Sequence, residues 1–301
     1  MSIKVEKVTK TYGKQNALDG VSFEIKTGEV VGFLGPNGAG KSTMMKILTC
    51  FIPQTSGQAW VCGFDVNEDS IAVRKNVGYL PENNPLYVEM YVKEYLEFIA
   101  GLHKLSKVRD RINEMIKACG LELEQNKKIG ALSKGYRQRV GLAQAMIHDP
   151  KVLILDEPTS GLDPNQLAEI RNLIIEIGKE KTVMLSTHIM QEVEAVCDRV
   201  IIINKGTIVA NDTTENIQQT TSSKQIITVE FAQLVTKASL LTINGVQEAH
   251  QLKENTWQLV CTDQRDLRAD VFQFAVANKL SVLTMQKEEQ KLEDVFKQLT
   301  K

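Results

Sequence analysis

Apolar and polar positions alternate near the start of the chain, and further along they give way to unbroken apolar runs. Residues 3–8 and 21–25 alternate apolar with polar or charged side chains, which predicts strands with one buried face. The runs at residues 30–34, 152–155 and 182–185 are almost wholly apolar, which predicts strands buried on both faces, as in parallel sheets. We therefore expect an α/β fold around a buried sheet.

The middle of the chain changes to a helical period. Its apolar residues recur at three- and four-residue spacing, at Leu96, Ile99 and Leu102 and again at Ile112, Met115 and Ile116. This pattern predicts a helical subdomain inserted over about residues 86–145.

A polar stretch separates this part from a smaller, C-terminal one. The composition shifts beyond Asn211 to Thr, Gln, Asn and Ser, and we expect residues 216–224 to be a linker. The pattern beyond it predicts, in order, a strand, a helix, two strands, a helix and a strand, at residues 225–231, 233–241, 243–249, 256–261, 267–277 and 280–285. This βαββαβ order is ferredoxin-like, so residues 225–301 are expected to form an accessory α+β domain. RNA-binding modules share the topology, but the aromatic pair and basic residues that they use are missing here.

Composition narrows the class of protein. The chain has 301 residues, is 43% hydrophobic and carries a net charge of −1, which suits a globular protein of two domains and disfavours a general nucleic-acid binder. Five scattered cysteines predict reduced thiols in a cytosolic compartment. The N-terminus lacks the apolar segment of a signal peptide, and no run approaches the roughly 18 to 20 apolar residues that span a bilayer. Any membrane role must then come through a partner.

The first apolar run leads directly into a phosphate-binding sequence. The nine residues are Gly35, Pro36, Asn37, Gly38, Ala39, Gly40, Lys41, Ser42 and Thr43, which fit G-x-x-x-x-G-K-[ST]. Glycines let successive backbone N–H groups turn around phosphate oxygens, and the start of the following helix adds further donors. Lys41 is expected to reach the β- and γ-phosphates, and the Ser42 hydroxyl is the expected Mg²⁺ ligand. This segment predicts that the chain binds a nucleotide.

The second apolar run ends in two carboxylates, Asp156 and Glu157. Ligands bind at the carboxyl ends of strands in open α/β sheets, and two adjacent acids there favour a shared cation. We expect Asp156 to hold Mg²⁺ and Glu157 to orient and deprotonate the attacking water.

Two further side chains are candidates for the same site. His188 follows the third apolar run and could donate a hydrogen bond to the developing phosphoryl charge, although a lone histidine after a strand is often structural. Tyr12 could stack the adenine base, and ordinary packing at a sheet edge explains it equally well.

Five elements in this order resemble the ABC-type ATPases. They are the phosphate loop, residues 132–139 (Leu-Ser-Lys-Gly-Tyr-Arg-Gln-Arg), the Asp156–Glu157 pair, residues 160–163 (Ser-Gly-Leu-Asp) and His188. The resemblance covers residues 1–215 and implies a P-loop NTPase domain with an inserted helical subdomain. It also implies a head-to-tail dimer that sandwiches ATP, in which Ser133 and Gly135 contact the γ-phosphate held by the other copy and Asp163 belongs to the nucleotide-binding set.

Three residues depart from the usual family pattern. Lys134 and Tyr136 replace the third and fifth residues of the common Leu-Ser-Gly-Gly-Gln signature. Glu82 stands where the family usually carries Gln between the γ-phosphate, Mg²⁺ and the membrane partner. Its carboxylate can ligate Mg²⁺ or accept from water, so it is kept as a catalytic and metal candidate, but it cannot donate as an amide does.

The resemblance also implies partners. In this family the helical subdomain and the loop at Glu82 receive the membrane subunit, and residues 291–299 resemble the closing helix of ATPases from ABC-2 exporters. Residues 78–87, 132–143 and 186–194 are similar to the ATPase subunit of gliding-motility-associated ABC transporters. We therefore expect an ATP- and Mg²⁺-dependent homodimer that energises a separately encoded, multi-spanning permease, most simply an exporter, and lies on the cytoplasmic face of the cell membrane without binding nucleic acid.

The alternative is a soluble ABC ATPase that acts on ribosomes or nucleic acid. Such proteins typically carry two cassettes or a long coiled coil between the phosphate loop and the acidic pair. This chain has one cassette and no heptad array in that interval, which favours the transporter interpretation.

Overall fold

The computed structural model describes residues 1–221, 225–261 and 266–288, together with residues 296, 299 and 300. The chain divides into two compact units, and the boundary in the sequence falls between Thr214 and Glu215.

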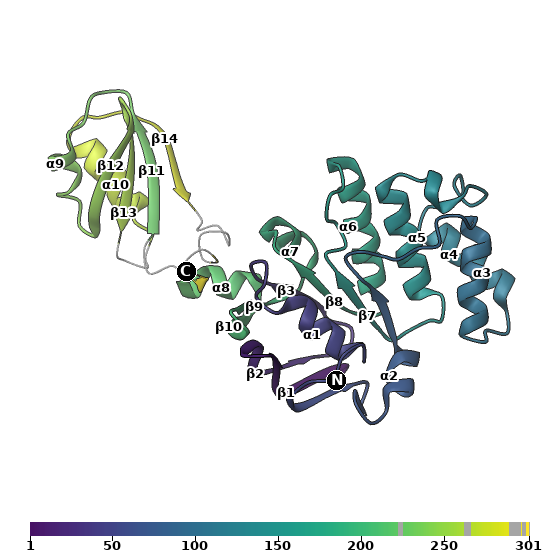
Figure 1. Cartoon of the computed structure of the whole chain (residues 1–301). Helices are drawn as coiled ribbons and strands as arrows, with labels where there is room; N and C mark the ends of the chain where they lie inside the picture. Colours follow the sequence, from purple (N-terminus) through teal and green to yellow (C-terminus); the bar gives the residue numbers. More distant parts are fainter. Residues whose placement is uncertain (222–224, 262–265, 289–295, 297–298, 301) are drawn as a thin grey trace. The chain divides into compact units, whose positions relative to one another are not determined.

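The first unit is built on a sheet of six strands in the order β10-β9-β3-β8-β7-β6 (Figure 1). The strands are β3 (Val30–Leu34), β6 (Val77–Leu80), β7 (Val152–Asp156), β8 (Thr182–Thr187), β9 (Arg199–Asn204) and β10 (Thr207–Asp212). All neighbouring pairs are parallel except β9 and β10. Every residue of β3, β7 and β8 is buried, which confirms the strands predicted from the three apolar runs. Parallel pairing places the carboxyl ends of β3, β8 and β7 side by side.

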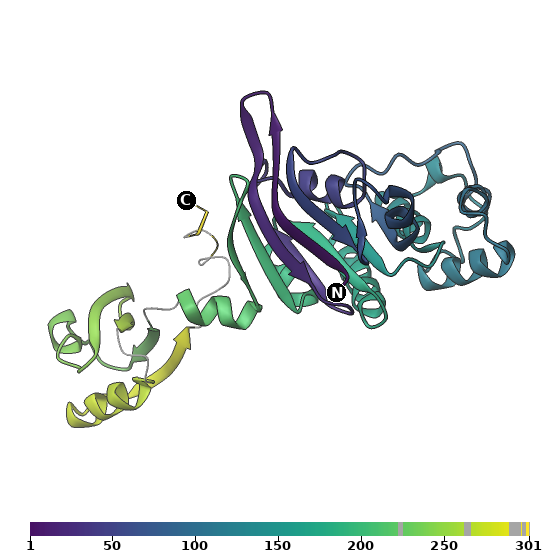
Figure 2. The ribbon, with the colours of Figure 1, turned by 90° about the horizontal axis from the view of Figure 1, so that it is seen from below.

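A second, antiparallel sheet has the order β2-β1-β4-β5. Its strands are β1 (Ile3–Tyr12), β2 (Gln15–Ile25), β4 (Ser56–Val61) and β5 (Phe64–Asp65). The first two are longer than the alternation predicts, because their pairing continues through Lys10↔Leu18 to Tyr12↔Gln15 and closes at Gly13, whose φ is 58°. Figure 2 shows the resulting hairpin projecting beyond the rest of its sheet.

Helix α1 (Lys41–Leu48) joins these two sheets into one core. Its residues Met44, Met45, Ile47 and Leu48 are fully buried and belong to a cluster with Phe23 of β2, Phe33 of β3 and other apolar residues of both sheets. The short helix α2 (Ser70–Asn76) adds Val73 to the same cluster. The phosphate-binding sequence thus enters a helix that is fixed on both sides by packing.

The other helices form a second core with the opposite side of the sheet. These are α3 (Val92–Leu102), α4 (Val108–Ala118), α5 (Lys134–Met146), α6 (Pro164–Gly178) and α7 (Met190–Val196), with a single 3₁₀ turn at Ile129–Ala131. Leu96, Ile116 and Leu142 pack in one cluster with Leu153 and Leu155 of β7. Figure 1 shows α3, α4 and α5 grouped together, as the helical period between residues 86 and 145 predicts.

The second unit follows the predicted order of elements. After α8 (Thr214–Thr221) come β11 (Gln225–Phe231), α9 (Lys237–Leu240), β12 (Val246–Lys253), β13 (Thr256–Cys261), α10 (Arg268–Ala277) and β14 (Val282–Glu288). The four strands form an antiparallel sheet in the order β12-β13-β11-β14. Ile227, Phe231, Trp257 and Val271 lie in its core.

Three details differ from the sequence prediction. Residues 214–221 form a helix that overlaps the linker expected at residues 216–224; this polar stretch contains neither Gly nor Pro, and its Ile217 is buried. Helix α9 is shorter than predicted because the Thr236 hydroxyl caps it by accepting from Ser239 N, and β12 starts late because Gly245 turns the chain at a φ of 96°. Most of the expected closing helix at residues 291–299 lies outside the described residues.

All five cysteines are free thiols. Within the described parts of the chain, every helix is too short or too polar to traverse a lipid bilayer.

Candidate functional site

The phosphate-binding loop connects the carboxyl end of β3 to the first turn of α1. Two of its glycines are required by close backbone contacts: a Cβ on Gly35 would lie 2.4 Å from the carbonyl oxygen of Ile203, and one on Gly40 would lie 2.4 Å from that of Ala17. Gly40 also has a φ of 110°, which other residues rarely adopt. The loop is therefore held tightly between β9 and β2, with its backbone open to the cavity described next.

A cavity of about 450 Å³ lies over this loop. Its walls come from the loop and α1 on one side and from the ends of several strands on the other. The lining residues are Ala17, Asn37, Gly38, Gly40, Lys41, Ser42, Thr43, Glu82, Glu157, Ser160 and His188. The structure thus brings the predicted phosphate-loop residues together with Glu82, Glu157 and His188.

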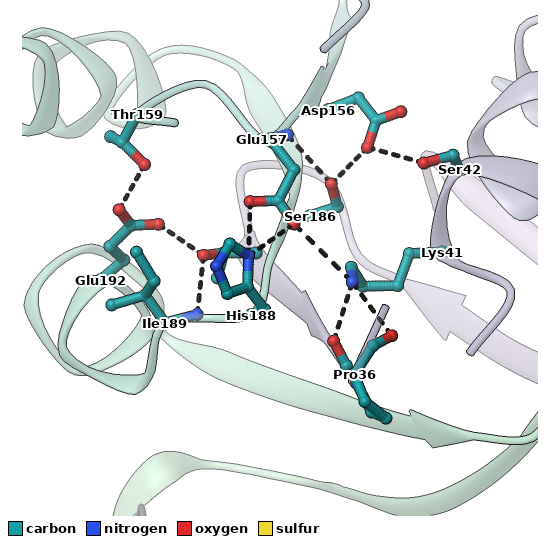
Figure 3. Close-up of polar contacts among 12 residues, drawn as sticks. Pro36, Lys41, Ser42, Asp156, Glu157, Thr159, Ser186, His188, Ile189 and Glu192 are labelled. Atoms are coloured by element: carbon teal, nitrogen blue, oxygen red, sulfur yellow. Dashed lines mark hydrogen bonds and ion pairs between the residues drawn. The ribbon is translucent and has the colours of Figure 1, made fainter. Parts of the chain in front are cut away.

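Lys41 is buried at the floor of this cavity, with 6% of its surface exposed. Its Nζ donates to the carbonyl oxygens of Gly35, at 2.7 Å, and Pro36, at 3.3 Å, and lies 3.7 Å from Oε1 of Glu157 (Figure 3). Burial lowers the pKa of this amine, and the neighbouring carboxylates of Glu157 and Asp156 partly offset that effect. The Lys41 ammonium is thus held at the floor of the cavity by two carbonyl oxygens and one carboxylate.

Asp156 is the centre of a hydroxyl network at the end of β7. Its side chain is buried, and its Oδ1 accepts from Ser42 Oγ at 3.2 Å and from Ser186 Oγ at 2.5 Å. Ser186 Oγ in turn accepts from the backbone N–H of Glu157 at 3.0 Å, so this one hydroxyl fixes both acids. The Ser42 hydroxyl and the Asp156 carboxylate are hard oxygen donors in direct contact, and this donor set fits Mg²⁺.

The backbone of Glu157 has a left-handed conformation. Its φ is 50°, in the left-handed region that a non-glycine residue enters at a cost of about 1 to 3 kcal/mol. Its carboxylate is nearly buried and accepts from Nδ1 of His188, which lies 3.1 Å from Oε1 and 3.0 Å from Oε2. A carboxylate only accepts, so this contact places a proton on Nδ1 of the imidazole. Figure 3 shows that Glu157 lies between Lys41 and His188.

Gly35, Pro36, Ala39 and Asp156 are not among the lining residues, and four predicted residues from other segments also lie outside the lining of this cavity. Tyr12 ends β1, is 52% exposed and has the Lys10 ammonium 5.3 Å from its ring centroid. Ser133 is the N-cap of α5, where it accepts from Tyr136 N, and Asp163 is the N-cap of α6, where it accepts from Asn165 N and Gln166 N.

The fourth of these residues, Gly135, packs against a neighbouring helix. A Cβ at this position would lie 2.6 Å from Cδ of Gln166, at the start of α6. The N-termini of α5 and α6 are therefore in direct contact.

A set of buried polar residues lies behind the cavity and was not predicted from the sequence. Ser186 was visible only as a polar residue at the end of an apolar run, and its bonds to both acids could not be inferred from its position. Thr159, Thr187 and Glu192 form a second network, described below. Nothing in the sequence indicates that the acid of this network, on a short helix, is buried.

Comparisons with known proteins agree with this geometry. Residues 18–160 match the family model described as "ABC transporter". The chain is 34% identical over 297 residues to the uncharacterized ABC transporter ATP-binding protein YdbJ of Bacillus subtilis, covering 98% of this chain and 94% of that protein. It is 32% identical to the linearmycin resistance ATP-binding protein LnrL of Bacillus subtilis, over 99% of this chain and 98% of that protein. Among solved structures, the dimeric ATP-binding cassette MJ0796 bound to ADP and Pi superposes with a TM-score of 0.64 at 28% identity, covering 70% of this chain and 98% of that one.

Proposed function

The chain belongs to the ABC transporter family as an ATP-binding protein and is an ATPase of that type, and from this premise we propose that it energises a separately encoded ABC-2 permease. The direction we propose is export, supported by the similarity of the whole chain to a linearmycin resistance protein. The assignment to the gliding-motility group stays a prediction from the three sequence segments that suggest it.

One observation carries the ATPase mechanism. The ends of β3, β7 and β8 place Lys41, Glu157 and His188 in continuous contact around one cavity, with Asp156 bonded to Ser42 beside them. A cation, a carboxylate base held by a histidine N–H, and a pair of metal-ligating oxygens are groups suited to phosphoryl transfer to water.

The roles follow from the atoms present. The loop N–H groups and the Lys41 ammonium would bind the β- and γ-phosphates, and this lysine would exchange its carbonyl contacts for phosphate oxygens. Ser42 and Asp156, with Glu82 at the rim, would hold Mg²⁺, which supplies neutralising charge to the phosphates. Glu157 would orient the attacking water and take its proton, while Nδ1–H of His188 fixes the carboxylate.

We propose further that ATP joins two copies of the chain. Ser133 is exposed at the N-terminus of α5 and lies outside the cavity of its own copy, so its hydroxyl and the adjoining helix N-terminus can face a γ-phosphate held by another copy. Gly135, buried against Gln166, and Asp163, at the N-terminus of α6, are proposed to belong to the same nucleotide-binding set. The solved cassette MJ0796 is dimeric with ADP and Pi, which supports the same assembly here. Tyr12, near the tip of the β1–β2 hairpin, is proposed as the adenine-stacking residue because its ring is open to solvent.

The second unit is proposed to be a ferredoxin-like accessory domain. Its strand order β12-β13-β11-β14 with two connecting helices supports that class. We propose that the full chain lies on the cytoplasmic face of the membrane, held there by its permease.

The test uses Glu157→Gln, which keeps the shape of the side chain and removes the base. ATP hydrolysis should fall by about 10² to 10⁴, since that is the usual contribution of a general base. ATP should still bind, and an ATP-bound dimer should accumulate in size-exclusion chromatography. Glu180→Gln, the same change at an exposed residue beyond α6, is the control. Steady turnover by Glu157→Gln would remove this residue from its proposed role.

A second experiment addresses the partner. Tagged Glu157→Gln protein is captured from detergent-solubilised membranes of its host with ATP present, and the retained proteins are identified by mass spectrometry. A stoichiometric multi-spanning protein is the expected result. Recovery of ribosomal proteins without any membrane protein would contradict the transporter assignment and leave the ATPase chemistry intact.

A further inference from the structure

Behind the cavity, a carboxylate is buried on helix α7. Glu192 is 2% exposed and is absent from the lining of the cavity, so it does not reach a bound nucleotide. Burying an acid is costly unless its oxygens are satisfied. Its two oxygens accept from two threonine hydroxyls: Oε1 from Thr159 and Oε2 from Thr187, the latter at 2.5 Å.

These two threonines belong to the segments that carry Glu157 and His188. Thr159 follows Glu157 by two residues, and Thr187 directly precedes His188. The Thr187 hydroxyl also accepts from the backbone N–H of Ile189 at 3.0 Å, so it is bonded across the position of His188. Figure 3 shows the chain of contacts from Thr159 through Glu192 to Ile189, alongside the Glu157–His188 pair.

One carboxylate thus ties together the two segments on either side of a contact that hydrolysis needs. The two side chains are held differently: Glu157 is buried at a left-handed φ of 50°, whereas the His188 side chain is 46% exposed and is not fixed by burial. The Ser186 network fixes the backbone of Glu157 at its amino side, and Glu192 fixes the same turn two residues later.

We propose that Glu192 is a positioning residue that sets the alignment of Glu157 and His188 for the hydrolytic step and leaves ATP binding to the phosphate loop. The inference deepens the proposed function and rests on it. Because Glu192 acts through two hydroxyls, its loss should displace the base by a fraction of an ångström to about 1 Å, a misplacement that can cost on the order of 10²-fold in rate.

The first variant is Glu192→Gln, which keeps the volume of the side chain. Its amide can accept from one threonine, but its NH₂ group then faces the other. Thr187 Oγ1 already accepts from Ile189, so its own proton would lose the acceptor it has now. We expect kcat for ATP hydrolysis to fall by about 10- to 100-fold with the Kd for ATP within about twofold of the unaltered chain. Because binding precedes the blocked step, the ATP-bound dimer should accumulate, as with Glu157→Gln.

Glu194→Gln is the matched control. It makes the same chemical change two residues later on α7, at an exposed side chain, and should leave kcat unchanged. A purely structural role for Glu192 would instead lower the melting temperature without altering kcat per folded molecule and without trapping a dimer.

A second pair of variants keeps the test decisive if Glu192→Gln does not fold. Thr159→Val removes one hydroxyl at constant shape and should reproduce the fall in kcat, whereas Thr159→Ser keeps the hydroxyl and should restore it. Combining Thr159→Val with Glu192→Gln should cost little more than either change alone, because both break the same bond.

The outcomes separate this inference from the function on which it rests. If the unaltered chain hydrolyses ATP, and Glu192→Gln and Thr159→Val both have the same kcat as the unaltered chain, the positioning role is overturned. The assignment of the chain as an ATPase is then unaffected. A fall in ATP affinity equal to the fall in kcat/KM, with unchanged kcat, also overturns the positioning role. Absence of hydrolysis by the unaltered chain overturns the proposed function and this inference together.

Discussion

We predict that His148, between α5 and β7, makes the stability of the first unit sensitive to mild acid. Its Nε2 lies 3.0 Å from the carbonyl oxygen of Val77 and therefore carries the proton of the neutral ring, while its buried Nδ1 has no partner among the described residues. The ring stacks on His103, which caps α3, with centroids 4.0 Å apart and planes 2° apart.

These surroundings disfavour protonation of Nδ1, which would give the His148 ring a positive charge. Burial lowers the pKa of His148 to about 4, and His103 and Arg111 add to the effect, while the Val77 carbonyl and the Asp149 carboxylate oppose it. Burial lowers the pKa of His103 as well. The unfolded chain takes up the proton near the ordinary value of 6.5, so stability is fully present above that pH and is lost as the pH falls toward about 4.

The magnitude follows from the shift. A fully buried ring with these two pKa values would lose about 2 kcal/mol of unfolding free energy between pH 7.5 and pH 5. The His148 ring is partly open to solvent, and screening reduces the expected loss to about 1 kcal/mol. In His148→Gln, whose amide can still donate to Val77, this part of the pH dependence should disappear.

The assay is urea unfolding at the two pH values. Trp60 lies in the first unit and Trp257 in the second, so a Trp257→Phe background leaves Trp60 fluorescence as the reporter of the unit that contains His148. His250→Gln, which alters an exposed histidine in the second unit, should retain the full loss. If His148→Gln loses as much stability as its parent between these pH values, the reasoning from burial and the unpartnered Nδ1 is wrong.

Two further predictions concern the nucleotide site. Ser186→Ala removes the hydroxyl that donates to Asp156 and accepts from Glu157 N, so kcat/KM for MgATP should fall about tenfold, or about 1.4 kcal/mol, in a steady-state phosphate-release assay; a change under twofold would contradict it. Lys134→Ala should weaken ATP-driven dimerisation by up to about fivefold at low salt, measured by light scattering in the Glu157→Gln background, with Lys179→Ala as control. Unchanged dimerisation would refute a role for the Lys134 charge.

The parts of the fold that could be predicted are those that the sequence specifies locally. Apolar runs identify β3, β7 and β8 because a strand buried on both faces has no polar alternation, and the rule that parallel strands end at one edge brings Lys41, Asp156 and His188 together. The βαββαβ order of the second unit could also be predicted locally, because its antiparallel strands alternate buried and more exposed residues, as β13 does.

What could not be predicted depends on contacts between distant segments. Ser186 and Glu192 are ordinary polar residues in the sequence. The pairing of β7 with β8 gives the Ser186 hydroxyl its partners, and the packing of α7 against β8 brings Glu192 to Thr187. The full length of the β1–β2 hairpin depends on cross-strand pairing, and the helix at residues 214–221 is polar apart from the buried Ile217. Polar composition alone does not separate such a helix from a linker.

At Glu157, the residue proposed for catalysis is not the residue that would be most stable in the left-handed backbone conformation found there. Glycine adopts this conformation without strain, and asparagine does so more readily than glutamate. A library of variants selected only for resistance to heating should therefore enrich Gly or Asn at this position. The selected proteins should have higher melting temperatures and should no longer hydrolyse ATP. If Glu157 is the base that we propose, the same change that relieves its backbone would remove the carboxylate that hydrolysis requires.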